Sequence, residues 1–410
     1  MTLRVTTRHL ADDRALLDLP PAPDDAVAWV RRGDGLVGWG VAARLVPGAG
    51  DDRFARAEAG FRDLVAAAEI DDEVRVPGSG LTAVGAFSFD ADAAGSSLVV
   101  PRVIVGRRDG ATWLTTIDPD GAPPVPGLAT SPPEPPPRDR PRFAGSSKPD
   151  LRWLEAVAAA VDRLRDGALD KVVLARDHAV WSQEPFDPLD LARRLTARFP
   201  SCHTFVVEGL VGATPELLLA RDGDRVTSRV LAGTTGRAED EAEDAALGAA
   251  LLASAKDRHE HQLAADSVRE VLAPRCPDLQ HAPEPRLLRL DNVQHLATVF
   301  SGHLAEPASV LEVVAELHPT AAVGGTPRDR ALEVIAELEG MDRGRYAAPV
   351  GWVDANGDGE WGIALRCAEL AGARARLFAG VGVVAASLPE DELEETRLKL
   401  LAMQAALGAD

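Results

Sequence analysis

Two distant segments of the chain each carry a pair of carboxylates three residues apart. Asp257 and Glu260 lie in Lys256-Asp-Arg-His-Glu-His261, and Glu392 and Glu395 lie near the C-terminus. Residues three apart share one face of a helix, so each pair presents two carboxylates in one direction. Either pair alone is typical of a solvated helix. Together they favour Mg²⁺, which binds one or two protein carboxylates plus water and substrate oxygens. The histidines beside Glu260 do not form HExxH, which disfavours zinc.

Three further polar residues interrupt apolar segments. Lys171 begins the run Lys-Val-Val-Leu-Ala-Arg, although a lysine at such a position is ordinarily a solvated strand end. Glu216 follows a proline and precedes three leucines, which indicates either an edge residue or a partly buried acid with a raised pKa. Arg366 ends the run Gly-Ile-Ala-Leu, and arginine is the natural bidentate partner of a carboxylate. These residues and the acidic pairs favour a magnesium-assisted site for a small polycarboxylate.

Other candidates lie in glycine-rich or proline-rich segments. His318 begins His-Pro-Thr-Ala-Ala-Val-Gly-Gly-Thr-Pro, and Tyr346 precedes Ala-Ala-Pro-Val-Gly-Trp. Gly380 and Gly382 imitate a dinucleotide fingerprint, but Pro389 follows where that fingerprint expects a helix. A glycine pair that lets backbone N–H groups approach a carboxylate is the alternative use.

Composition limits the class of protein. The chain has 410 residues, and with 46% of them hydrophobic it can bury a large core without disulfides. Lys and Arg number 44 against 64 Asp and Glu, and the net charge of −20 disfavours nucleic acid or an anionic membrane as the main partner. The three cysteines are far apart, which favours a reducing compartment. No apolar run is long enough for a spanning helix, so we expect a cytoplasmic protein without a membrane partner.

The chain divides by pattern into three parts. Residues 1–117 form a weakly patterned N-terminal part, and residues 118–149 are proline-rich, which is typical of a linker or long surface loop. Residues 150–410 are regular and carry every candidate residue above. We expect the N-terminal part to share one structural domain with them.

Periodicity predicts the elements that position these residues, and their antiparallel-looking grouping favours an α+β fold. The predicted helices are 150–166 with Asp150 as N-cap, 187–199, 238–272 and 390–407. The predicted strands are 80–89, 97–106, 171–180, 203–208, 216–221, 347–353, 361–370 and 373–378. The segment 354–359 is predicted to be a hairpin turn rather than a calcium loop, because Leu365 stands where the loop needs a glutamate.

The ordered set of motifs resembles the chorismate-utilising enzyme family, and within it the isochorismate synthases most closely. The motifs run from Lys171 to Lys399: KVVLAR, GATPELLL, LAGTTGR, SAKDRHEH, HPTAAVGGTP, RYAAPVGW, GEWGIALRC, RLFAGVGVV and EETRLK. The resemblance implies a large α+β fold with two packed antiparallel sheets covered by helices. It also implies Mg²⁺-dependent conversion of chorismate to isochorismate, by water addition at C2 and loss of the C4 hydroxyl, for menaquinone or siderophore synthesis.

The resemblance also implies a role for each matched residue. Lys171 matches the general base, which must be neutral to act, and Glu216 matches the general acid. Glu260 and Glu395 match magnesium ligands, with Asp257 and Glu392 as outer carboxylates acting through water. The positions matching substrate-binding residues are Gly233, Thr234, His318, Tyr346, Arg366, Gly380, Gly382 and Lys399. Ala321, Ala348 and Thr235 depart from common family residues, which leaves fine specificity open.

Alternatives remain at the level of the reaction. Salicylate synthase shares the base, acid and metal and then eliminates pyruvate, so it is the second candidate. Aminodeoxychorismate synthase also retains a lysine at this position and comes third, whereas Lys171 disfavours anthranilate synthesis. No obligatory glutaminase partner is therefore expected. A non-catalytic binding protein on the same scaffold is disfavoured by the intact Lys171, Glu216, Glu260 and Glu395.

Overall fold

The computed structural model describes residues 2–22, 24–119, 127–130 and 140–408. Within these ranges, 21 strands form one hydrogen-bonded network, and every pairing is antiparallel except the parallel pair β1–β4. Eight α-helices and one short 3₁₀ helix (Leu16–Asp18) surround the network in the same ranges. The predicted α+β class is confirmed.

The network divides at strand β6 into two branches, because β7 and β5 pair with different halves of the same β6 edge. The first branch contains, in order of pairing, β4 (Glu69–Asp72), β1 (Leu3–His9), β7 (Ala111–Pro119), β6 (Ser97–Arg108), β3 (Asp34–Leu45), β2 (Val27–Arg31), β10 (His203–Val207), β11 (Leu210–Thr214), β20 (Cys367–Ala371), β21 (Arg374–Val383) and β9 (Lys171–Trp181). Strands β8 (Arg142–Gly145) and β17 (Gly325–Thr326) pair with β9. The second branch leaves β6 through β5 (Thr82–Ala86), β18 (Pro349–Asp354), β19 (Gly359–Ile363), β12 (Leu217–Asp222), β13 (Arg225–Gly236) and β16 (Val293–His303), with β15 (Arg286–Arg289) and β14 (Gln280–His281) on β16.

The two branches are the two sheets that the resemblance implied, joined along one shared strand. Strands before residue 120 pair directly with strands of the second half, as in β2–β10 and β5–β18, so both parts of the chain contribute to both branches. Alternate residues of a strand belong to different hydrophobic clusters: Phe205 and Val207 face one cluster, and Val206 faces the other. This alternation is the period expected for a sheet covered on both faces.

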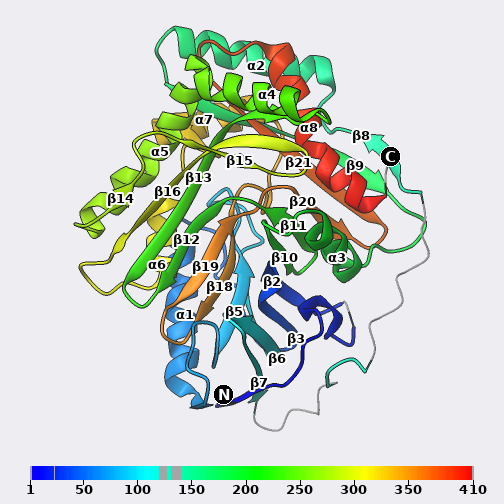
Figure 1. The fold of residues 1–410 in the computed structure, drawn as a ribbon, viewed down its shortest axis with the longest axis vertical. Helices are drawn as coiled ribbons and strands as arrows, with labels where there is room; N and C mark the ends of the chain where they lie inside the picture. Colours follow the sequence, from blue (N-terminus) through cyan, green and yellow to red (C-terminus); the bar gives the residue numbers. More distant parts are fainter. Residues whose placement is uncertain (1, 23, 120–126, 131–139, 409–410) are drawn as a thin grey trace.

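Helices cover the outside of the branches (Figure 1). They are α1 (Arg53–Ala67), α2 (Asp150–Arg165), α3 (Pro188–Arg198), α4 (Glu241–Ala253), α5 (Ala255–Arg275), α6 (Val310–Leu317), α7 (Arg328–Glu339) and α8 (Pro389–Leu407). Helices α2, α4, α7 and α8 gather at one end of the molecule, and strands β3, β6 and β7 lie at the other (Figure 1). No helix in the described ranges is both long and apolar enough to cross a bilayer.

Several predicted boundaries are wrong in informative ways. The single helix predicted over 238–272 is two helices, α4 and α5, because Ser254 adopts an extended conformation and its side chain caps α5 by accepting from the Asp257 N–H (3.2 Å). The single strand predicted over 361–370 is broken into β19 and β20. Asp150 is the first residue of α2 rather than its cap, and it pairs with Arg176. The hairpin turn at 354–359 is confirmed between β18 and β19.

Half of the proline-rich segment, residues 120–126 and 131–139, lies outside the described ranges. Its described end is not a simple linker, because Arg142–Gly145 forms strand β8 against β9. Cys202, Cys276 and Cys367 are all buried with free thiols.

Candidate active site

A pocket lies between the two branches and receives most of the predicted site residues. Its lining comes from β9 and β21 of the first branch, from β13 and β16 of the second, and from helices α5 and α8. The predicted residues that line it are Glu216, Gly233, Thr234, Glu260, Tyr346, Arg366, Gly380, Gly382, Glu395 and Lys399. These residues are up to 183 positions apart in sequence, so only the pairing of the strands brings them together.

Lys171 lies behind this pocket as the first residue of β9. Its side chain is fully buried, and its Nζ lies 3.2 Å from Oε1 of Glu260 on α5. Within the described ranges the amine makes no hydrogen bond that meets normal geometry. Lys171 and Glu260 therefore form a buried pair of opposite charges, each the other's counter-charge.

Glu216 faces the same pocket from the segment that joins β11 to β12. Its side chain is buried, and burial raises its pKa to about 7, although the backbone of Leu231 and the charges of Lys171 and Arg366 oppose this shift. A carboxyl group with this pKa is substantially protonated at neutral pH. It can therefore donate a proton to a leaving group.

The acidic residues of α5 and α8 meet at the pocket, each paired with a lysine. Burial raises the pKa of Glu260, and the charge of nearby Glu395 raises it further. Glu395 forms an ion pair with Lys399, with Oε1 and Nζ 2.6 Å apart. Two carboxylates that repel one another in a buried pocket fit a divalent cation, because the cation would replace the lysines as counter-charge.

The two residues matched to outer carboxylates do not line the pocket. Glu392 is buried and bound to Lys256 of α5 at 2.6 Å, and burial together with Glu395 raises its pKa to about 7. Asp257 lies against Gly233, where a Cβ would stand 3.2 Å from the Asp257 Cβ. Asp257 therefore lies directly behind a lining residue, whereas Glu392 is held by Lys256, which does not line the pocket.

Arg366 projects into the pocket from the break between β19 and β20. Its φ of +48° is unusual for a residue with a side chain, and this conformation interrupts the strand that the sequence pattern predicted. Within the described ranges it forms no ion pair, and its buried Nε has no partner. An arginine held in a strained conformation without a protein carboxylate is well suited to bind a substrate carboxylate.

His295 on β16 was not identified from the sequence, yet it links two predicted residues. One Arg366 Nη lies 3.1 Å from His295 Nε2, and His295 Nδ1 lies 3.1 Å from the Thr234 hydroxyl. Burial and the charge of Arg366 hold the His295 pKa well below its usual range, so the ring is neutral. Its Nε2 accepts from Arg366, and its Nδ1–H donates to Thr234, whose own hydrogen is left for the pocket. In the sequence, His295 could have been noticed as a histidine within the predominantly apolar segment 293–300.

The remaining predicted residues separate into two groups. The Tyr346 ring stacks on Phe378 at 5.0 Å, and burial raises the pKa of its hydroxyl. Lys399 Nζ donates to the Gly380 carbonyl at 2.8 Å.

His318 does not reach this pocket: it is buried near Phe54 and Phe89, and its Nε2 lies 3.3 Å from the Phe89 carbonyl oxygen. The structure therefore brings His318 to a different cavity.

Gly382 is required by the close approach of the buried ion pair. A Cβ at this position would overlap the Glu260 carboxylate and lie 2.9 Å from Cε of Lys171. We expect Gly382→Ala to lower turnover at least tenfold, because the methyl group must displace both charged side chains. Gly236→Ala on β13 is the matched control, since a Cβ there has no neighbour within 4 Å. Equal activity of the two variants in a steady-state assay would contradict this account.

Comparison with known proteins identifies the family. The chorismate binding enzyme family matches residues 128–408, which is more than half of the chain. The chain belongs to this family.

Relatives of the chain include named isochorismate synthases. A Mycobacterium tuberculosis protein provisionally named isochorismate synthase MenF is 40% identical over 343 residues, covering 80% of this chain and 86% of the relative. Isochorismate synthase DhbC of Bacillus subtilis is 43% identical over 270 residues, covering 63% of this chain and 68% of the relative. The solved structure of MenF, the menaquinone-specific isochorismate synthase of Escherichia coli, matches with a TM-score of 0.80 at 25% identity, covering 99% of this chain and 94% of that chain.

Proposed function

We propose that this protein is an Mg²⁺-dependent isochorismate synthase. One observation carries the proposal: three kinds of group meet at one pocket. They are the buried Lys171–Glu260 pair, the separate buried acid Glu216, and an arginine that has no carboxylate partner in the described ranges. The reaction adds water at C2 of chorismate and removes the C4 hydroxyl, so it needs one base and one acid that act at different ring positions. Named relatives with this activity support the assignment.

Lys171 is the general base in this proposal, and Glu216 is the general acid. Neutral Lys171 takes a proton from the water that attacks C2, and protonated Glu216 gives its proton to the hydroxyl that leaves C4. Arg366 binds a substrate carboxylate, oriented by neutral His295, and Thr234 donates a further hydrogen bond. Tyr346 forms part of the wall that excludes water from the ring.

The carboxylates of Glu260 and Glu395 suit a magnesium site. When bound, Mg²⁺ would neutralise the ring carboxylate and fix its orientation. Asp257 and Glu392, one on each helix, would add to the negative charge around that site.

The product formed from chorismate tests the reaction. The purified protein with Mg²⁺ should yield isochorismate as the accumulating product when the mixture is separated by liquid chromatography. Salicylate with stoichiometric pyruvate would instead support a salicylate synthase, the second candidate. An aminated product formed with ammonia would support an aminodeoxychorismate synthase. One relative is named as menaquinone-specific and another as vibriobactin-specific, so the proposal concerns the reaction rather than the pathway.

The pH profile should report the ionisation of Glu216. Its pKa of about 7 lies within the working range, and only the protonated form can act as the acid. We therefore expect kcat/KM to fall as pH rises above about 7. Glu216→Gln should lower kcat about 10²-fold, because glutamine keeps a hydrogen bond but supplies no proton, and its residual rate should lack this decline. A decline that persists in the variant would assign the ionisation to another group.

The same residue should make the fold less stable at high pH. The folded-state pKa of about 7 lies above the unfolded value of 4.5, so unfolding favours ionisation. This contribution to stability is complete below pH 4.5 and is lost as pH rises through 7. Glu216→Gln should therefore raise the free energy of unfolding at pH 8 by about 1–3 kcal/mol relative to wild type, and much less at pH 5. Urea denaturation at the two pH values measures this difference, with the exposed Glu155→Gln as control.

A further inference from the structure

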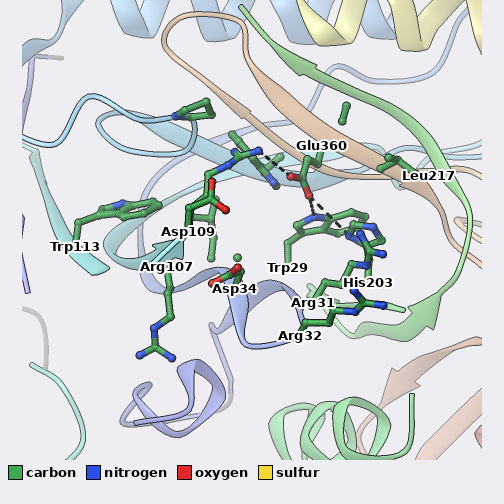
Figure 2. A pocket seen from close by; sticks show the side chains of 16 residues that line it. Trp29, Arg31, Arg32, Asp34, Arg107, Asp109, Trp113, His203, Leu217 and Glu360 are labelled. Carbon is green, nitrogen blue, oxygen red and sulfur yellow. Dashed lines mark hydrogen bonds and ion pairs between the residues drawn. The ribbon is translucent and has the colours of Figure 1, made fainter. Parts of the chain in front are cut away.

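A second cavity of about 290 Å³ lies outside the candidate active site. None of its lining residues lines the active-site pocket. Its walls come from β2, β3, β6, β7, β10, β12, β18 and β19, and the indoles of Trp29, Trp113 and Trp352 are among its lining groups. Figure 2 shows Trp29 and Trp113 among them. All three residues are at most 3% exposed, so each borders the cavity with a small part of its surface. Contact with these indoles would favour a flat ring over an aliphatic chain.

Two arginines lie at the mouth of this cavity without carboxylate partners. Arg31 donates from Nε to the Ser201 carbonyl (2.9 Å), and its terminal nitrogens have no partner in the described ranges. Arg32 also forms no ion pair in those ranges. Figure 2 shows both arginines near His203 at one side of the cavity, with Trp113 at the other.

The other two arginines in the lining are already engaged. Arg107 donates to the carbonyls of Asp12 and Arg14, at 3.0 and 2.9 Å. Arg108 lies 3.4 Å from Glu360. Four guanidinium groups and three carboxylates line the cavity, so the lining carries one net positive charge in a chain of net charge −20. This balance fits a ligand with a single negative charge.

His203 supplies an unsatisfied polar group inside the cavity. Its side chain is 3% exposed, and neither ring nitrogen has a hydrogen-bond partner in the described ranges. The Glu360 carboxylate is 3.8 Å from Nδ1, and that carboxylate accepts from Trp29 Nε1 at 2.9 Å. Burial holds the His203 pKa well below its usual range, so the ring is neutral and can both donate and accept. A buried polar group of this kind costs free energy until a ligand hydroxyl pairs with it.

Local conformation at the mouth is also unfavourable for Arg32. It occupies the β2–β3 turn with φ of +53°, where asparagine or glycine is preferred. Asp109 occupies the equivalent position of the β6–β7 turn, with φ of +51°, and aspartate tolerates this conformation. Arg32 therefore occupies a turn position whose positive φ is unfavourable for arginine.

We propose that this cavity binds a small hydroxylated aromatic carboxylate. The carboxylate pairs with Arg31 and Arg32, the ring lies among the three indoles, and the ring hydroxyl pairs with His203. Bound ligand would also contact Leu217, the residue next to Glu216, so the site adjoins the segment that carries the acid.

Calorimetry with 3-hydroxybenzoate on the full-length protein tests this proposal. We expect saturable binding with one site, weakened at least tenfold by Arg32→Asn and by Arg31→Gln, because each variant removes a charge-assisted hydrogen bond. Arg32→Asn should fold well, since asparagine suits the turn. Asp109→Asn is the matched control: it changes the equivalent turn position but removes a negative charge, so affinity should stay the same or increase. Benzoate and phenol, which each lack one group, should bind several-fold more weakly.

The candidate active site could also bind this probe, so Arg366→Gln distinguishes the two locations. Binding that survives in Arg366→Gln and weakens in Arg32→Asn supports the proposal. Binding that is lost in Arg366→Gln and unchanged in Arg32→Asn places the probe in the active site and overturns it. Absence of measurable binding at millimolar probe, or equal affinity for benzoate and 3-hydroxybenzoate, also overturns the assignment.

Discussion

Lys171→Gln should lose isochorismate formation by about 10²–10⁴-fold while it still binds chorismate. The reason is chemical: glutamine cannot take a proton from water, whereas a neutral amine can. Substrate binding should survive because Arg366 lies at the pocket independently of this residue. The measurement is a steady-state assay with chromatographic product analysis, which separates kcat from KM.

The substitution also removes the partner of a buried carboxylate, so folding must be checked in parallel. Without Lys171, Glu260 loses the positive charge that opposes its raised pKa, and we expect it to be protonated rather than buried as an unpaired charge. Lys148→Gln is the control, because this partly buried lysine instead donates to the Leu338 carbonyl. Normal turnover in Lys171→Gln would exclude the base role, and a covalent adduct at Lys171 with an aminated product would favour aminodeoxychorismate synthesis.

In residues 150–410, the sequence pattern predicted those strands and helices that are marked by apolar runs and by residues that start helices. The strand that begins at Lys171 and the helix that begins after Asp187 both occur in the structure, although the first seven residues of β9 are all buried rather than alternating. The branching of the sheet at β6 could not be read from any segment. The branching arises because β5 and β7 pair with different halves of one edge of β6, and such pairing between distant segments is not encoded in either strand alone.

The candidate site was predicted by residue type but not by its hydrogen-bond network. The predicted strand 361–370 runs through Arg366, and the break at this residue became clear only when β19 and β20 were seen to pair with different partners. His295 lies opposite Thr234 in the β13–β16 register, a relation that no local motif encodes. Gly382 was identified as a glycine for close approach, but its neighbours, Glu260 and Lys171, come from two distant elements.

Removal of magnesium should abolish turnover. Glu260 and Glu395 reach one pocket from different helices, and both are balanced by lysines in the absence of a cation. We expect excess chelator to stop isochorismate formation and added Mg²⁺ to restore it. Glu260→Gln and Glu395→Gln should each lower activity by more than 10²-fold at ordinary Mg²⁺ concentrations, because glutamine keeps the shape but loses the charge that holds a hard cation.

A binding measurement separates a metal defect from a folding defect. Calorimetric titration of Mg²⁺ into the wild type without chorismate, which the active enzyme would consume, should give one site, and each glutamine variant should need much more Mg²⁺ to reach saturation. Glu392→Gln is a control for the loss of a buried carboxylate outside the pocket lining. Lys256 already pairs with this carboxylate at 2.6 Å, so the loss of Mg²⁺ affinity should be smaller than in Glu260→Gln or Glu395→Gln. Apo-protein stability can change in either direction, since each substitution also relieves repulsion between buried carboxylates. Full turnover in excess chelator would remove the metal from the mechanism and leave Lys171, Glu216 and Arg366 to carry the reaction alone.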